Sequence, residues 1–480
     1  MRTRTVICLA LLVGCGEDAA PEPVDVTTSG ESAEPRMEPD EQDVEDPGPI
    51  APQPGAGFER CGLPDYAWLE PSEMGELRDS EQVYAIESPL LTAVQFVLTD
   101  QLDLPLARTP QVGIELHRIR YGTQDRGAPI EATGVVAFPD VEQSTEVPVV
   151  LLLHGTTGAT DRCAPSLEIE DPATDDFASA ALVAILASYG YVVVAPDYIG
   201  MKSSGEPSPE LHPYLIGEAT AIASWDALRA ARQVLVAETD STVVPGRVAI
   251  WGGSQGGHAA AFTVRYGPYY APEFDVAAGV YAIPPTDLNP HLSSALSSVR
   301  SATANTILFF ATASQWYDVP NGTDDVFLPP YNTELVQALE EDCGPDVPVD
   351  ELDELFTAEA LAAVGESGFE AFAPWDCMGR ENSLTTTSVE RRDTVPGLVI
   401  LAENDTLVET AIERDSFDRL CEQGMRLHYL ECAGASHTEG FIYSIDDALD
   451  FIELGLADAV PSEGLCERTP ARICSNTPGR

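Results

Sequence analysis

Lysine is almost absent from this chain of 480 residues, and basic residues of any kind are scarce. Lys202 is the one lysine, and 25 Lys and Arg residues stand against 79 Asp and Glu residues, which gives a formal net charge of −54. A surface this acidic repels phosphate backbones, so nucleic-acid binding through basic patches is excluded. Lys202 does not follow a glycine-rich loop, which excludes a phosphate-binding loop of the G-x-x-x-x-G-K-S/T type.

Three further patterns are missing from the sequence. No run of 18 apolar residues occurs, so an ordinary transmembrane helix is not expected. No two cysteines have the C-x-x-C spacing of a structural zinc site, and no two histidines have the H-E-x-x-H spacing of a zinc hydrolase. We therefore expect no metal and no cofactor.

The first fifteen residues have the pattern of an export signal. Arg2 and Arg4 precede a short apolar stretch, which ends in Leu12-Val13-Gly14-Cys15. This ending resembles the lipobox of bacterial lipoproteins, and the resemblance implies cleavage before Cys15 and lipid attachment to its sulfur. We expect 1–14 to be a lipoprotein signal peptide, and the exported chain to be lipid-anchored at the outer membrane or cell surface. The alternative is a plain secretory signal that contains a cysteine.

The segment that follows lacks the composition of a folded domain. Between residues 16 and 57 there are twelve acidic residues, one arginine, eight prolines and no aromatic residue. Like-charge repulsion, proline and low hydrophobicity together prevent a packed core. The segment 15–57 is therefore predicted to be a disordered acidic tether.

From residue 111 onward, apolar strand patterns alternate with helical patterns. Strands are expected at 112–121, 132–138, 147–153, 191–195, 247–251, 276–283, 398–402 and 426–430. Helices are expected at 176–189, 216–237, 255–266, 410–422 and 440–454. Several strands are continuously apolar, as in strands buried on both faces. The pattern predicts an α/β fold with a mostly parallel sheet covered on both faces, and with an antiparallel edge formed by the first two strands.

The alternation is interrupted between residues 284 and 393. This insertion of about 110 residues is too long for a simple loop, and its patterns are mostly helical. We expect a helical cap over 284–393, inserted into a main domain that comprises 58–283 and 394–480.

Eight cysteines remain after the signal and Cys15, and an even number in an exported chain predicts disulfides. Cys343 and Cys377 both lie in the expected cap, and we expect them to pair. Cys421 and Cys432 are close in sequence, but an intervening strand of seven residues would hold them roughly 23 Å apart, so they are not expected to pair.

One serine lies in a turn with chemical significance. The strand 247–251 runs into Gly252-Gly253-Ser254-Gln255-Gly256-Gly257 and then into a helix. This is G-x-S-x-G in a strand–turn–helix setting, where the turn is sharp and a Cβ at either outer glycine would clash. Ser254 would be exposed at a helix N-terminus, as a catalytic nucleophile requires. The alternative is a glycine-rich turn with a structural serine.

A nucleophilic serine needs a base, and the base needs an orienting acid. On such folds the acid and then the histidine follow the serine along the chain. Asp405, just after strand 398–402, is the expected acid, with Glu403 as its nearest rival. His437 lies on a loop of small residues after strand 426–430 and is the expected base.

The oxyanion of an acyl-transfer intermediate also needs two N–H donors. One is expected from the backbone of Gln255, directly after the nucleophile. The other is expected from the loop after strand 147–153, with Thr156 as the first choice and Thr157 as the alternative.

Several motifs together resemble the secretory lipase family of fungi and actinobacteria, which belongs to the α/β-hydrolases. They are Gly-Gly-Ser-Gln-Gly-Gly-His at the turn, Ala195-Pro196-Asp197-Tyr198, His212-Pro213-Tyr214 and Asp226-Ala227-Leu228-Arg229-Ala230-Ala231-Arg232. The resemblance covers roughly residues 85–455. It implies an α/β-hydrolase fold with an inserted cap, hydrolysis of carboxylic esters, and Ser254, Asp405 and His437 as the catalytic residues.

The leading hypothesis is a serine esterase or lipase that acts on a small-molecule or lipid ester through an acyl-enzyme intermediate. A serine peptidase of the prolyl or aminopeptidase type would use the same triad and needs a group that recognises an amine or a proline ring. A third possibility is a non-catalytic surface binding protein on a hydrolase scaffold. The presence of all three triad residues argues against that third reading.

Overall fold

The computed structural model describes residues 59–479 except 103–104, 170–176, 240–241, 342, 344–346 and 348. The expected signal peptide, Cys15 and the expected tether lie outside the described residues, as does the first residue of the helix expected at 176–189. Among the described residues, no helix is both long enough and apolar enough to cross a membrane.

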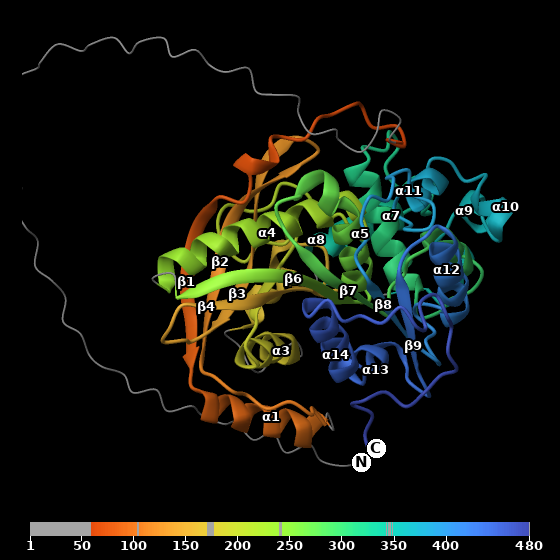
Figure 1. Cartoon of the computed structure of the whole chain (residues 1–480). Helices are drawn as coiled ribbons and strands as arrows, with labels where there is room; N and C mark the ends of the chain where they lie inside the picture. Colours follow the sequence, from red (N-terminus) through yellow and green to blue (C-terminus); the bar gives the residue numbers. More distant parts are fainter. Residues whose placement is uncertain are drawn as a thin grey trace, which may run out of the picture. The chain divides into compact units, whose positions relative to one another are not determined.

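The described strands form one sheet in the order β1-β2-β3-β5-β4-β6-β7-β8-β9 (Figure 1). The pairs β1–β2, β2–β3 and β3–β5 are antiparallel, and all pairs from β5 to β9 are parallel. The bounds are β1 Leu77–Ile86, β2 Ile114–Asp125, β3 Ala128–Pro139, β4 Thr145–Leu153, β5 Val192–Pro196, β6 Val243–Gly253, β7 Val276–Ala282, β8 Gly397–Ala402 and β9 Leu427–Cys432. The predicted mostly parallel sheet with an antiparallel edge is confirmed.

The edge strand β1 is the one strand that the sequence pattern misses. Its residues are exposed or half-buried throughout, so its sequence shows no alternation of apolar and polar residues. The helix after it, α1 (Ser88–Leu102), also escapes the pattern.

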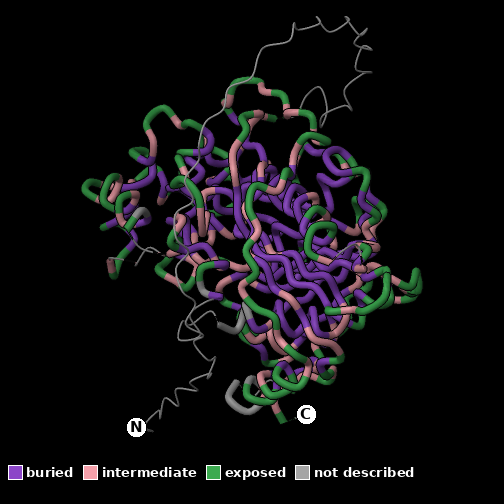
Figure 2. Tube along the Cα trace, turned by 90° about the vertical axis from the view of Figure 1, so that its left-hand side faces the viewer, coloured by how far each residue is buried: buried purple, intermediate pink, exposed green. Residues whose placement is uncertain are grey.

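Helices cover the sheet on both faces, as the continuously apolar strands predict. Alternate residues of β4 enter two separate cores: Val149 and Leu151 pack with α4 and α5, whereas Val150 and Leu152 pack with α3 and α14. Figure 2 shows the buried residues concentrated in the middle of the molecule. Besides α1, the described helices outside the expected insertion are α2 Pro165–Glu168, α3 Phe177–Ser188, α4 Gly217–Glu238, α5 Gln255–Tyr270, α12 Thr410–Glu422, α13 His437–Ile442 and α14 Ile445–Leu456. The single helix expected at 440–454 is thus two helices.

The segment 284–393, where a helical cap is expected, contains the helices α6 to α11 among its described residues. Its helices are α6 Leu288–Ala295, α7 Thr303–Trp316, α8 Tyr331–Glu341, α9 Ala358–Ala362, α10 Glu366–Phe369 and α11 Trp375–Glu381. Phe309, Phe310 and Trp375 are fully buried in the same core as α4 and α5. The insertion therefore packs onto the main domain and shares its hydrophobic core.

Four disulfides connect the eight cysteines: Cys61–Cys377, Cys163–Cys343, Cys421–Cys466 and Cys432–Cys474. The expected Cys343–Cys377 pair is wrong, because each of these cysteines instead ties the insertion to the main domain. The expectation that Cys421 and Cys432 do not pair is confirmed. Each bonds to a cysteine of the C-terminal segment, with Cα–Cα separations of 5.7 and 5.2 Å.

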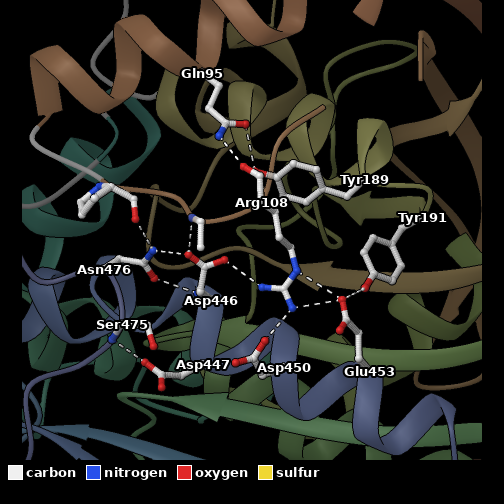
Figure 3. Close-up of polar contacts among 12 residues, drawn as sticks. Gln95, Arg108, Tyr189, Tyr191, Asp446, Asp447, Asp450, Glu453, Ser475 and Asn476 are labelled. Atoms are coloured by element: carbon white, nitrogen blue, oxygen red, sulfur yellow. Dashed lines mark hydrogen bonds and ion pairs between the residues drawn. The ribbon is translucent and has the colours of Figure 1, made fainter. Parts of the chain in front are cut away.

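An arginine-centred cluster fixes α14 to two other segments (Figure 3). The guanidinium of Arg108 donates to Asp446 at 2.8 Å, to Asp450 at 2.7 Å and to Glu453 at 3.0 Å, all on α14. Asn476 also binds Asp446, through its own side-chain oxygen and the Asp446 backbone N–H. Arg108 and three acidic residues thus join the segment after α1 to α14, and Asn476 joins α14 to the C-terminal segment.

Candidate active site

Ser254 lies in a sharp turn between β6 and α5. Its backbone has φ 57° and ψ −122°, a conformation that residues with a side chain rarely adopt. A Cβ on Gly252 would meet the carbonyl oxygen of Gly256, and a Cβ on Gly256 would meet that of Leu153. Both glycines are therefore required by the close approach of β4, β6 and α5, for the reason that the sequence motif predicts.

The structure brings the three expected triad side chains into one hydrogen-bonded line. His437 Nε2 lies 2.8 Å from Ser254 Oγ, and His437 Nδ1 lies 2.6 Å from Asp405 Oδ2. Ser254 follows β6 and Asp405 follows β8, while His437 is the first residue of α13. The three residues come from separate connections at the same edge of the parallel sheet, which is where α/β sheets build their sites.

Asp405 is held rigidly and is largely out of water. Its Oδ1 accepts the backbone N–H groups of Leu407 and Val408, each at 2.9 Å, and its side chain is 2% exposed. The rival acid Glu403 is exposed and accepts the N–H of Gly434 at 2.8 Å. Asp405 is thus the acid that contacts His437, whereas Glu403 braces the loop that carries the histidine.

The histidine loop has its own local support. Ser436 caps α13 in a capping box, in which the carboxylate of Glu439 accepts the Ser436 backbone N–H at 2.8 Å. Hydrogen bonds from the Ser436 hydroxyl and from the Ser436 backbone N–H lower the pKa of Glu439, which favours its charged form. The capping box fixes the first residue of α13, His437, relative to β9.

Gln255, the first expected oxyanion donor, begins α5 directly after the nucleophile. Its side-chain amide lies 2.6 Å from His212 Nε2, and His212 Nδ1 lies 2.9 Å from the carbonyl oxygen of Ile199. Burial lowers the pKa of His212 to about 3, so its ring is neutral at working pH. Nδ1 then donates to Ile199 and Nε2 accepts from Gln255, which fixes the side chain beside the turn.

The loop with the second expected donor is held by two tyrosines. Tyr198 donates its hydroxyl to the carbonyl oxygen of His154 at 3.1 Å. The Tyr214 hydroxyl lies 3.0 Å from Thr156 Oγ1 and accepts a hydrogen bond from Asn305 of α7 at 2.8 Å. Thr157, the alternative donor, directs its hydroxyl to the sulfur of Met201 at 3.7 Å.

The sequence motifs alone do not mark Tyr198, His212, Tyr214 or Asn305 as site residues. Tyr198, His212 and Tyr214 lie inside motifs that carry the family resemblance, and that clustering was the available signal. Asn305 lies in the insertion, and no local pattern marks it.

A cavity of about 400 Å³ opens at Ser254 and is called the large cavity below. The loop from His154 to Thr157 and residues at the start of α13 supply polar lining. Leu182 and Val183 of α3 and Phe441 of α13 supply apolar lining. The triad is therefore accessible to a small organic molecule.

The model of the secretory lipase family matches residues 175–313, which include α3, α4, α5 and Ser254. No curated protein matches the chain in sequence. The chain therefore shares a family pattern over the turn and its flanking helices.

Solved structures match over most of the chain. A rice cell wall degrading esterase, LipA, from Xanthomonas oryzae is 22% identical with a TM-score of 0.60, covering 80% of this chain and 97% of that one. A putative hydrolase from Legionella pneumophila is 19% identical, with a TM-score of 0.63 and coverages of 80% and 100%. Candida antarctica lipase A is 14% identical, with a TM-score of 0.61 and coverages of 88% and 90%. The chain has the α/β-hydrolase fold, and the family match together with this fold supports a carboxylic ester hydrolase.

Proposed function

We propose that this protein is a serine hydrolase that cleaves carboxylic esters through Ser254, His437 and Asp405. The observation that carries the proposal is the unbroken line of hydrogen bonds from Asp405 through His437 to Ser254, at a cavity. A serine held in a strained turn at a helix N-terminus, with a base and an orienting acid in reach, has the geometry of a nucleophile.

In the acylation step, Ser254 Oγ attacks the carbonyl carbon of the ester and its proton passes to His437 Nε2. The tetrahedral intermediate then collapses: the bond from carbon to the alcohol oxygen breaks, and the proton on Nε2 passes to that oxygen. Asp405 holds His437 with Nδ1 protonated and stabilises the imidazolium that forms. The alcohol leaves and an acyl group stays on Ser254.

Deacylation repeats these steps with water. His437 removes a proton from a water molecule, which attacks the acyl carbon, and the proton returns to Ser254 Oγ as the acid leaves. In both steps, the proposed oxyanion donors are the backbone N–H groups of Gln255 and Thr156. Both threonines line the large cavity, and support for Thr156 over Thr157 comes from its side-chain contact with Tyr214, whereas Thr157 contacts the Met201 sulfur.

We further propose that residues 284–393 act as a cap over the site. Asn305 of α7 lines the large cavity and contacts Tyr214, so the insertion supplies part of the binding surface. Two disulfides tie the insertion to the main domain, which limits how far it can open.

Export and anchoring complete the proposal. Four disulfides fit an oxidising compartment outside the cytoplasm. Cleavage before Cys15 and lipid attachment to Cys15 would anchor the chain to a membrane. The acidic segment 15–57 would connect this anchor to the folded domain.

An amine-binding peptidase site has less support. The buried carboxylate that lines the large cavity, Asp197, already accepts hydrogen bonds from Ser166 and Thr133. Burial raises the pKa of Asp197 to about 6, so the carboxylate is still mostly ionised at pH 7. Both of its oxygens already accept hydrogen bonds, and this makes it a poor partner for an ammonium group.

A panel of carboxylic esters and aminoacyl amides, given to the purified domain and to its Ser254→Ala variant, tests the proposal. We expect ester hydrolysis by the wild type and loss of that activity in the variant. Cleavage of the amides alone would favour the peptidase, and activity on neither class would favour a binding protein.

A further inference from the structure

The substrate cavities divide around the nucleophile, and from this division we infer that the protein prefers esters of a short-chain acid with a large alcohol. The inference rests on the proposed function, because it assumes that Ser254 is acylated. It adds a direction of binding and a limit on acyl length, neither of which follows from the triad itself.

Ser254 lies at the junction of two cavities. Besides the large cavity, a small cavity of about 50 Å³ also reaches Ser254. Asn305 and Leu407 also line both cavities, so the two cavities adjoin at these residues and at Ser254. A bound ester can therefore place its two halves in different cavities, with the reacting carbon at Ser254.

The chemistry determines which half enters which cavity. The alcohol oxygen must reach His437 Nε2, because that nitrogen returns the proton when the bond to the alcohol breaks. His437, Thr438 and the loop with Thr156 all line the large cavity, and none of them lines the small one. The alcohol half therefore extends into the large cavity, and the acyl chain points away from His437 into the small one.

The small cavity is apolar and short. Leu288 and Leu292 of α6 and Phe309 of α7 form much of its wall, and these side chains are 2%, 5% and 0% exposed. A volume of about 50 Å³ holds about four water-sized groups, since one such group needs roughly 10–15 Å³ on this measure. An acetyl to butyryl chain fits this space, whereas an octanoyl chain does not.

The large cavity suits a bulky alcohol with both polar and apolar parts. It has eight times the volume of the small cavity, about 400 against about 50 Å³. Thr157 and Ser166 line it together with Leu182 and Phe441. An aromatic or polyol alcohol fills such a space, whereas methanol or ethanol leaves most of it empty.

A matrix of esters tests the direction of binding. The acids are acetate, butyrate, octanoate and palmitate, and each is supplied as a 1-naphthyl ester and as a methyl ester. We expect kcat/KM for the naphthyl esters to fall at least tenfold between butyrate and octanoate, and the methyl esters of the short acids to be at least tenfold poorer than the naphthyl esters. A preference for long-chain methyl esters would reverse the assignment of the two cavities and overturn the inference.

A matched pair of substitutions tests whether the small cavity sets the limit on acyl-chain length. Leu292→Ala enlarges the small cavity and should raise the octanoate-to-butyrate ratio of kcat/KM at least fivefold. Leu182→Ala makes the same chemical change in the wall of the large cavity and should leave that ratio within twofold. An equal effect of both substitutions would contradict the inference.

Ala302→Leu is a second test of the small cavity, for use if Leu292→Ala does not fold. Ala302 precedes α7 and lines the small cavity with Thr306, one helical turn later. Ala302→Leu fills the cavity without removing packed atoms, so it should lower kcat/KM for butyrate at least tenfold relative to acetate. An unchanged ratio would contradict the inference, whereas absence of Ser254-dependent hydrolysis of every ester would refute the proposed function instead.

Discussion

Asp405 and His437 are joined by a contact of 2.6 Å between Oδ2 and Nδ1, although 32 residues separate them in the chain. The second carboxylate oxygen of Asp405 is occupied by the two N–H groups of Leu407 and Val408. The carboxylate therefore cannot rotate freely, and it offers His437 an acceptor in one orientation.

Replacing Asp405 tests whether this orientation matters. Asp405→Asn would offer an amide N–H to Nδ1, which favours the wrong tautomer of His437, so we expect kcat to fall roughly 10³–10⁴-fold with little change in KM. Glu403→Gln is the matched control, because Glu403 lies on the same loop and a glutamine amide oxygen can still accept the Gly434 N–H. It should retain activity within about threefold of wild type, and steady-state kinetics on one ester measures both. Comparable losses in the two variants would contradict the assignment of the acid.

The hydroxyl of Tyr214 should contribute to the rate rather than to substrate affinity. Tyr214→Phe removes the contacts with Thr156 and Asn305, so the proposed oxyanion donor loses its support and kcat should fall about tenfold. Tyr189→Phe is the control, because its hydroxyl contacts Gln95 and the Arg108 carbonyl, which do not line the large cavity. A change in KM alone, measured with an acetate ester, would mean that Tyr214 acts only on binding.

Much of the main sheet could be predicted because its strands are buried on both faces. Strands such as 147–153 and 191–195 are continuously apolar, and burial in a parallel sheet is the environment that produces such runs. The edge strand β1 could not be predicted, since its pairing with β2 depends on backbone hydrogen bonds and leaves most of its side chains in solvent. The Cys61–Cys377 and Cys163–Cys343 disulfides could not be predicted either, because they depend on how the insertion packs against the main domain.

Ser254, Asp405 and His437, the three residues of the proposed triad, could be located in the sequence because each follows a strand, and the structure brings them within hydrogen-bonding distance. The residues that hold the oxyanion loop could not, because Tyr198, Tyr214 and Asn305 approach it from three different parts of the fold. Such contacts join segments far apart in the chain, so no local pattern encodes them.

Acid should weaken the fold partly through His258. This side chain is buried on α5, and burial lowers its pKa to about 4, from about 6.5 in an unfolded chain. The unfolded chain therefore takes up the proton first as the pH falls. The contribution of His258 to the free energy of unfolding is complete above pH 6.5 and is lost as the pH falls toward 4.

His258→Gln should remove this dependence. The difference in the free energy of unfolding between pH 7 and pH 4.5 should shrink by roughly 2–3 kcal/mol, measured by urea denaturation at the two pH values. Asp197→Asn should act in the opposite sense, because burial raises the pKa of Asp197 to about 6 and its contribution falls as the pH rises from about 4 to about 6. An unchanged pH dependence in His258→Gln would show that the histidine is not the group responsible.

Anchoring can be tested independently of catalysis. Cys15→Ser removes the proposed lipid attachment site, so the protein should move from the membrane fraction to the soluble exported fraction. Cys8→Ser alters a residue that is expected to leave with the signal peptide, so it should not change the location. Mass spectrometry should find a lipid-modified Cys15 at the mature N-terminus; a mature terminus elsewhere would refute the lipoprotein assignment.

The central claim is that Ser254 is the nucleophile, and covalent labelling tests it most directly. The purified domain is treated with an organophosphonate ester, digested and analysed by mass spectrometry, with His437→Ala as a comparison that lacks the base. We predict one labelled serine, Ser254, with labelling at least 100-fold slower in His437→Ala. A label on another serine, or labelling that is equally fast without His437, would contradict the account.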